Sequence, residues 1–169
     1  MLVYKKADLF GVVESTTDWI LAHGVNCQGV MGAGVAKDVK RRYPPAFDRY
    51  ADCIYQVDSR VDHYIQRYKM LMGSVKFVKV DKKKRGYIAN CFTQEQYGRD
   101  KSVVYLSYDA LYHSLSEVAR YSLYEKDLMV YAPLIGCGYA NGAERIVRAI
   151  FAQVFESEYP DARCQVCVQ

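Results

Sequence analysis

Hydrophobic residues in this chain gather in short continuous runs, and the stretches between the runs have the spacing of amphipathic helices. The runs occupy 2–6, 19–25, 75–80, 87–92 and 128–135, and runs of this length are typical of strands. The run at 87–92 is almost entirely apolar, which indicates a strand buried on both faces. Strands that alternate with helices predict an α/β fold, a three-layer α/β/α sandwich with a mixed central sheet.

Three of the stretches between strands carry an apolar stripe at intervals of three and four residues, which predicts three helices. Pro44 and Pro45 are expected to end the first of them. The pattern between 46 and 72 is irregular and predicts no helix ends. The inward positions are expected to be Val35, Ala36, Val39 and Tyr43 in the first helix, Tyr108, Leu111, Leu115 and Val118 in the second, and Ile146, Val147, Ile150 and Val154 in the third.

The end of the chain alternates between apolar and polar residues over 163–169, which predicts a terminal strand. Cys164 and Cys167 in that strand have the spacing of a redox or metal pair, but residues three apart on a strand face opposite sides of the sheet. We therefore expect no paired role for them. The six cysteines are interpreted as reduced thiols, because nothing in the sequence points to an oxidising compartment.

The stretch 23–36 joins a strand to a helix through a glycine-rich loop. Gly29, Gly32 and Gly34 lack a Cβ, so the backbone there can adopt positive φ and approach a ligand closely. The first turn of the following helix has free N–H groups that point back into the loop. This combination predicts an anion site, and phosphate is the expected anion.

Two well-known phosphate loops are excluded by the residues that follow Gly34. A Walker loop requires Gly-Lys-Ser/Thr, whereas Val35 and Ala36 stand there. The dinucleotide fingerprint requires a third glycine at the position that Lys37 occupies. A loop that only turns tightly onto a helix, without a ligand, is the alternative interpretation.

Length and composition favour one soluble domain over residues 1–169. With 169 residues, of which 51% are hydrophobic, the chain can bury a sizeable core without a second domain. It contains no apolar stretch of about 18 residues and no charged leader before an apolar segment, so neither a membrane span nor a signal peptide is expected. We therefore expect a cytoplasmic, intracellular protein with no membrane partner.

Four separated stretches resemble the ligand-binding motifs of the macrodomain family. They are Ala7 to Phe10, Leu21 to Ala36 followed by Arg41 to Pro44, Tyr87 to Gln94, and Pro133 to Gly142. Because they agree with the family in order and distance, the resemblance covers nearly the whole chain. Within the family the sequence is most similar to the branch that contains ADP-ribose 1''-phosphate phosphatases and the hydrolases that remove ADP-ribose from carboxylates or DNA bases.

The resemblance implies a binding site for ADP-ribose. Asp8 would accept a hydrogen bond from the adenine amino group and the Leu9 N–H would meet a ring nitrogen, although on sequence alone Asp8 is better explained as a turn residue. Asn26 would bind the distal ribose, and its alternative role is a structural cap. The ligand is expected to lie between Gly32, Ala33, Gly34 and Val35 on one side and Gly136, Cys137, Gly138, Tyr139, Ala140 and Asn141 on the other, with Gln94 nearby.

Two residues depart from the relatives that release ADP-ribose from glutamate or DNA bases. Gln94 stands where those relatives use a lysine, and Ala140 stands where the glutamate-specific relatives place an aspartate. Gln cannot form a Schiff base or carry a proton as Lys does, and Ala supplies no base. These activities are expected to be absent or slow.

His23 is the remaining candidate for catalysis, and Asn26 would assist it by orienting the distal ribose. A histidine in this crevice could act as a general acid or base near neutral pH. The alternative is a histidine packed or hydrogen-bonded at a strand end.

Three functions from different classes stay open. The first is an enzyme that hydrolyses ADP-ribose 1''-phosphate to ADP-ribose and phosphate, with no metal and no cofactor. The second is an enzyme that removes ADP-ribose from a modified protein or nucleic acid. The third is a module that only binds ADP-ribose derivatives. The first is the expected function. We expect a monomer whose partners are ADP-ribose and ADP-ribose 1''-phosphate. The second function would have ADP-ribosylated macromolecules as partners.

Overall fold

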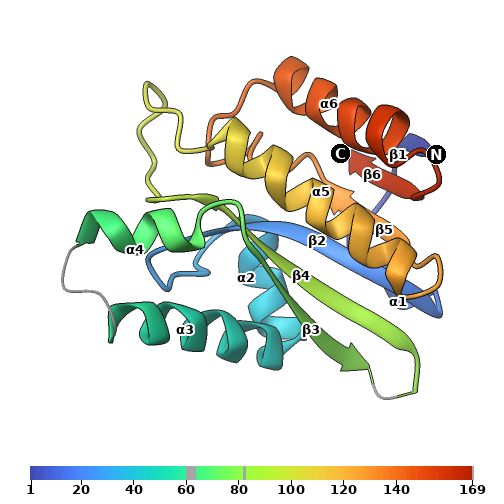
Figure 1. Ribbon diagram of the computed structural model, residues 1–169, viewed down its shortest axis with the longest axis horizontal. Helices are drawn as coiled ribbons and strands as arrows, with labels where there is room; N and C mark the ends of the chain where they lie inside the picture. The colour runs from blue at the N-terminus through green and yellow to red at the C-terminus, as the bar shows by residue number, and fades with distance from the viewer. Residues whose placement is uncertain (60–63, 82, 169) are drawn as a thin grey trace.

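A computed structural model of the chain, which describes residues 1–59, 64–81 and 83–168, is built around a six-stranded sheet (Figure 1). The strands are β1 (Leu2–Lys6), β2 (Asp18–Asn26), β3 (Val75–Asp81), β4 (Arg85–Gln94), β5 (Met129–Pro133) and β6 (Cys164–Val168). They lie in the order β1-β6-β5-β2-β4-β3. Neighbouring strands are parallel except β3 and β4, which are antiparallel. The predicted mixed sheet is confirmed.

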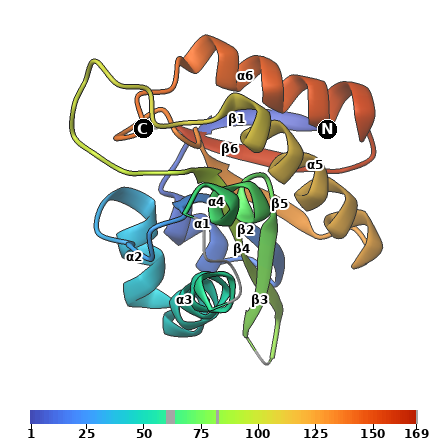
Figure 2. The same ribbon diagram turned by 60° about the vertical axis from the view of Figure 1, so that its left-hand side comes forward.

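Helices cover both faces of the sheet, which gives the predicted three layers (Figures 1 and 2). They are α1 (Leu9–Glu14), α2 (Gly34–Arg42), α3 (Pro44–Asp58), α4 (Tyr64–Leu71), α5 (Tyr108–Tyr124) and α6 (Glu144–Ala152), which continues into a π-helical turn, η1 (Gln153–Glu158). α5 and α6 pack on one face, and α1, α2 and α3 pack on the other. The strands are therefore enclosed between two helical layers.

The central strands are buried on both faces, as the sequence predicts for 87–92. Along β2, Ile20 and Ala22 face the core under α5 and α6, whereas Trp19 and Leu21 face the core under α1 and α2. In β4 the residues between the two ends are all buried. Because successive side chains of a strand point to opposite faces, a strand that is covered on both sides reads as a continuous apolar run.

Two parts of the helical layer differ from the prediction. The irregular stretch 46–72 contains most of α3 and all of α4. α2 ends at Arg42, just before Pro44 and Pro45 as predicted, but Pro44 also begins α3, because a proline in the first helical position lacks only an N–H that has no intrahelical acceptor. The expected inward position of Ile146 is wrong, since that side chain is 37% exposed. Val147 and Val154 are buried as predicted, and Phe151, which was not predicted, is buried as well.

The cysteines agree with the prediction from strand alternation. Cys164 lies in the core under α5 and α6, and Cys167 lies in the core on the opposite face of the sheet. All six cysteines carry free thiols. Over the described ranges, none of the helices combines the length and the apolar character that crossing a membrane requires.

Candidate functional site

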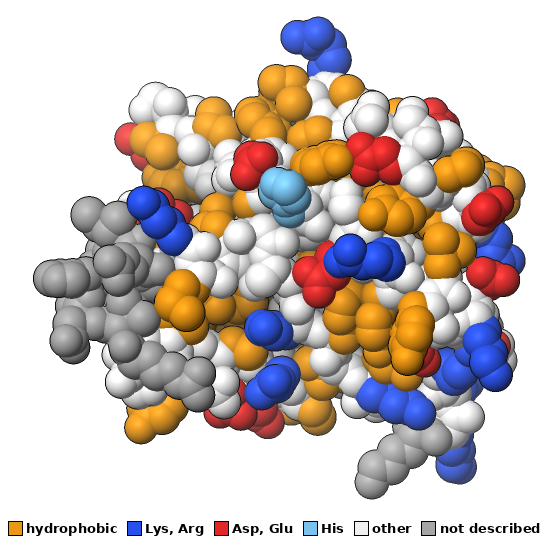
Figure 3. All heavy atoms as spheres, in the orientation of Figure 1, with side chains coloured by type: hydrophobic (Ala, Val, Ile, Leu, Met, Phe, Trp, Pro, Cys, Tyr) orange, Lys and Arg blue, Asp and Glu red, His pale blue; other side chains and the backbone are white. Residues whose placement is uncertain are grey.

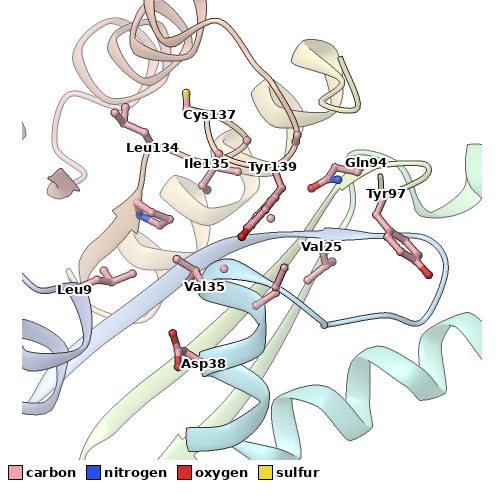
Figure 4. Close-up of a pocket in the computed structure, with 18 of the residues that line it drawn as sticks. Leu9, Val25, Val35, Asp38, Gln94, Tyr97, Leu134, Ile135, Cys137 and Tyr139 are labelled. Atoms are coloured by element: carbon pink, nitrogen blue, oxygen red, sulfur yellow. The ribbon is translucent and has the colours of Figure 1, made fainter. Parts of the chain in front are cut away.

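A pocket of about 1010 Å³ opens at the carboxyl ends of the parallel strands (Figure 4). Its walls come from the ends of β1, β2, β4, β5 and β6 and from the loops that follow β1, β2, β4 and β5. This edge of an open α/β sheet is where ligands ordinarily bind. In Figure 4, Leu9 lies at one end of the pocket, Gln94 and Tyr97 lie at the other, and Tyr139 lies between them.

The first glycine loop forms the wall next to α2. Gly29 and Gly34 have φ values of +78° and +54°, which favour glycine. Ala33 occupies the N-cap of α2, so no side chain caps the first turn of the helix. The N–H groups of that turn are therefore available to an anion. The expected residues Gly32, Ala33, Gly34 and Val35 all line the pocket.

Asn26 lies at the pocket wall, and its side chain holds the first glycine loop together. Its Nδ2 donates to the Val30 carbonyl at 2.7 Å, and its Oδ1 accepts from the Gln28 N–H at 2.9 Å. The hydroxyl of Tyr50, a fully buried residue of α3, lies 2.7 Å from the same Oδ1. The structural cap that the sequence allowed is therefore present, and the ribose contact stays a prediction. Tyr50 was not predicted, because its only sequence signal is an apolar position in the irregular stretch.

The second glycine loop forms the opposite wall. Gly136 has a φ of +81°, and its carbonyl accepts the Gly142 N–H at 2.8 Å, which closes the loop on itself. Tyr139 is 62% exposed and stands at the mouth of the pocket (Figure 4). Five of the six expected residues line the pocket: Gly136, Cys137, Gly138, Tyr139 and Ala140.

Asn141, the sixth, does not line the pocket, and this corrects its expected place. Its Nδ2 donates to the carbonyls of Asp100 and Val103 at 2.8 and 2.7 Å. Next to it, the Ala140 carbonyl accepts the Tyr105 N–H at 2.9 Å. Asn141 therefore ties the second glycine loop to the segment 95–107. Its φ of +55° lies in a region that Asn enters more readily than most residues.

Asp8 and Leu9 meet the pocket at the end of β1. Asp8 is the N-cap of α1, and its Oδ2 accepts the Gly11 N–H at 2.8 Å. Both residues line the pocket. The turn role that the sequence favoured for Asp8 is realised, and the second carboxylate oxygen, Oδ1, forms no hydrogen bond with any other residue that the structure describes.

His23 lies outside the pocket lining, which corrects its expected place in the crevice. Its side chain is 1% exposed, and Nε2 lies 2.7 Å from Oδ1 of Asn90. Burial lowers the pKa of the imidazole to about 4, and the hydrogen bond with Asn90 opposes that shift only in part. The ring is therefore neutral near pH 7 and does not reach the ligand space, so this geometry gives no support to a proton relay.

Known proteins with related sequences and folds bear on this pocket. The scan against family models found no match. The ADP-ribose 1''-phosphate phosphatase of Meyerozyma guilliermondii is 31% identical over 109 residues, which are 60% of this chain and 58% of that relative. The match therefore spans less than two thirds of the relative's length. Among solved structures, the macrodomain of Mycobacterium tuberculosis DarG has a TM-score of 0.75 and 22% identity, and it covers 99% of this chain and 97% of its own.

The chain has the macrodomain fold. The resemblance that the four motifs indicate is thereby confirmed. A second solved structure, Thermosipho africanus DarTG in complex with ADP-ribose, has a TM-score of 0.73 and 16% identity over 99% of this chain and 41% of that chain.

Gln94 and the segment after it complete the pocket of this chain. Gln94 ends β4 and lines the pocket, and its Nε2 donates to the Gln96 carbonyl at 3.2 Å. Tyr97, Gly98 and Arg99 also line it. These three were not predicted, because no apolar periodicity marks their segment and only contacts distant in sequence bring it to the pocket. Among the other unpredicted lining residues, Lys6, Phe10 and Asp38 are near neighbours of predicted ones.

The described part of the chain offers no metal ligand set, and the thiol in the pocket lining is not a ready nucleophile. Within residues 1–59, 64–81 and 83–168, no group of three His, Cys, Asp or Glu side chains is placed to hold a metal ion. Cys137 lines the pocket, but burial raises the pKa of its thiol, which keeps it protonated near pH 7. The lining can supply hydrogen bonds, glycine-loop N–H groups and a few charges.

Proposed function

We propose that this macrodomain binds ADP-ribose in the pocket and hydrolyses ADP-ribose 1''-phosphate to ADP-ribose and phosphate. The observation that carries the proposal is the pocket that runs along the strand ends between two glycine loops (Figure 4). From β1 to β4 the sheet has four spacings between neighbouring strands, which span roughly 19 Å at about 4.8 Å each. This length suits an elongated ligand with a diphosphate between two sugars.

The ligand groups find complementary partners in order along the pocket. At the β1 end, Oδ1 of Asp8 can accept a hydrogen bond from the adenine amino group, and Leu9 in the first turn of α1 has an N–H without an intrahelical acceptor. In the middle, the uncapped first turn of α2 faces the second glycine loop, which suits the diphosphate. The distal ribose would then lie near Asn26 and Gln94.

The comparisons support both halves of the proposal. The relative from Meyerozyma guilliermondii is named an ADP-ribose 1''-phosphate phosphatase, and a structural neighbour from Thermosipho africanus was solved in complex with ADP-ribose. Transferred to this chain, these properties predict the ligand and the reaction.

The reaction would break the bond between phosphorus and the C1'' oxygen, while a water oxygen forms a new bond to phosphorus. ADP-ribose would keep the C1'' oxygen and gain a proton from that water. Such a phosphoryl transfer depends mainly on positioning and on stabilising the charge of the transferred group. None of the described lining residues is a histidine, and the hydrogen-bond donors and charges of the lining suit these two effects.

A second candidate function is binding of ADP-ribose without turnover. The burial of His23 away from the pocket favours it, since that residue was the expected proton donor or acceptor. In this case the same pocket would retain ADP-ribose derivatives and release no phosphate.

One assay separates the two candidates. Purified protein is incubated with ADP-ribose 1''-phosphate, and phosphate and ADP-ribose are measured together over time. The proposed enzyme forms both in equal amounts, and the activity disappears in a Gly34→Glu preparation, which would retain any contaminating phosphatase. A protein that binds ADP-ribose yet releases no more phosphate than a protein-free control is a binding module.

A further inference from the structure

The segment 95–107 forms the wall of the pocket at the β4 end. Arg99 lies in this segment and lines the pocket. The part of the segment that follows Arg99 is held, because Asn141 donates to the carbonyls of Asp100 and Val103, and the Ala140 carbonyl accepts the N–H groups of Tyr105 and Leu106. Arg99 is therefore carried on a segment braced against the second glycine loop.

The guanidinium of Arg99 is not bound by any other residue that the structure describes. It forms no ion pair and no hydrogen bond with the other residues in 1–59, 64–81 and 83–168. Asp100, the adjacent acid, is already engaged, since its Oδ1 accepts from the Ser102 N–H at 2.9 Å and from the Ser102 hydroxyl at 2.7 Å. An arginine without a partner at a pocket wall offers a planar set of donors that fits a phosphate.

Charge is distributed unevenly along the pocket. At the β1 end, Lys6 and Asp8 are two residues apart and oppose each other, and on α2 the carboxylate of Asp38 pairs with Arg41 at 2.9 Å. At the β4 end, Arg99 is the only charged residue among the described lining residues. The pocket is thus close to neutral where the adenosine would lie and positive at its far end.

We propose that Arg99 is the residue that selects ligands with a terminal phosphate on the distal ribose, in preference to ADP-ribose that ends in a hydroxyl. This inference rests on the proposed function, which places the adenosine at the β1 end and so places the 1'' position next to the segment 95–107. The extra phosphate carries the negative charge that is missing from the described lining at the β4 end. ADP-ribose without that phosphate leaves the guanidinium in contact with water.

The test compares two affinities in each protein. Dissociation constants for ADP-ribose and for ADP-ribose 1''-phosphate are measured by displacement of a labelled ADP-ribose, with phosphate release followed in the same sample to correct the ligand concentration. The variants are Arg99→Gln, Arg99→Lys and, as the matched control, Lys101→Gln. Lys101 lies in the same segment and is exposed, but it does not line the pocket.

Arg99→Gln should weaken binding of the 1''-phosphate about tenfold or more and binding of ADP-ribose less than about threefold, because a hydrogen-bonded charge pair is lost only in the first case. Arg99→Lys should recover part of the preference, and Lys101→Gln should keep the wild-type ratio. An unchanged ratio in Arg99→Gln, an equal loss for both ligands, or the same change in Lys101→Gln would overturn the inference. If the wild-type protein binds neither ligand, the proposed function itself fails.

Discussion

At the scale of single residues, His23, Asn90 and Ala46 form a buried chain of hydrogen bonds between β2, β4 and α3. Nδ2 of Asn90 donates to the Ala46 carbonyl at 2.9 Å, which leaves Oδ1 of Asn90 to accept from Nε2 of His23. The neutral imidazole therefore carries its proton on Nε2. Nδ1 is buried without a hydrogen-bond partner in the described part of the chain, so protonation of the ring would place an unpaired charge in the core.

We predict that acid destabilises the protein through His23. The folded pKa of about 4 lies below the ordinary value of 6.5, so the contribution of this residue is full above pH 6.5 and is lost as the pH falls toward 4. Between about pH 7 and about pH 4.5 the loss amounts to about 2 kcal/mol in the free energy of unfolding. In urea unfolding at the two pH values, the free energy of unfolding of His23→Gln should fall by about 2 kcal/mol less than that of the wild-type protein.

If His23→Gln keeps the wild-type pH dependence, His23 is not neutralised by burial.

The place of His23 along β2 shows where sequence reasoning stops. Distance along the chain places His23 within three residues of Asn26, and that distance predicted a shared crevice. The crevice, however, begins at Gly24, and it is lined by Val25, which lies on the same face of β2 as His23. His23 is therefore excluded because it lies further from the end of the strand, and a strand buried on both sides does not show in its sequence where a crevice begins.

At the scale of elements, the junction of β2, the first glycine loop and α2 is the part of the fold that suits an anion. Gly34 combines a φ of +54° with a place on the pocket wall and at the first residue of α2. A side chain at this position would stand in front of the uncapped N–H groups. The backbone conformation of Gly34 costs an L-residue about 1–2 kcal/mol.

Gly34→Glu should therefore abolish ADP-ribose binding in a protein that still folds, because it adds bulk and negative charge where a phosphate must approach the backbone. Calorimetric titration measures the binding, and circular dichroism with thermal unfolding checks the fold. Gly73→Ala is the control, since Gly73 has a φ of +80° but does not line the pocket. That variant should lose stability and keep its affinity. Normal binding by folded Gly34→Glu would show that this loop is not the site.

Elements with continuous apolar runs were predictable, and those positioned by distant contacts were not. The strand at 87–92 could be predicted from its composition, because burial on both faces leaves few polar residues in it. The segment 95–107 has no such pattern. It reaches the pocket through Asn141 and the carbonyl of Ala140, which lie more than thirty residues away in sequence. Tyr50 was not predictable for the same reason, because a contact distant in sequence, its hydrogen bond to Asn26, joins α3 to the first glycine loop.

At the scale of the whole molecule, the surface and the pocket favour a small ligand. On the face shown in Figure 3, the basic and acidic side chains of the described residues are interspersed, so that face has no continuous basic area of the kind that a polyanion would cover. The pocket, by contrast, brings together segments from both ends and the middle of the chain around one space.

We predict absent or slow release of ADP-ribose from glutamate-linked or thymine-linked conjugates. Gln94 lines the pocket with an amide that can neither form a Schiff base nor carry a proton, and Ala140 is buried and supplies no base. Release of labelled ADP-ribose from a modified protein and from a modified oligonucleotide measures the two activities, with a known hydrolase as positive control. Fast turnover of either conjugate would contradict the proposed phosphatase function.

The measurement that tests the pocket most directly is a pair of calorimetric titrations, one with ADP-ribose and one with AMP. AMP retains the groups that the β1 end would hold, but it lacks the second phosphate and the distal ribose that the two glycine loops would enclose. The account predicts that ADP-ribose binds at least about tenfold more tightly, since charge-assisted hydrogen bonds to the second phosphate are lost in AMP. Equal affinities, or no binding of ADP-ribose, would contradict it.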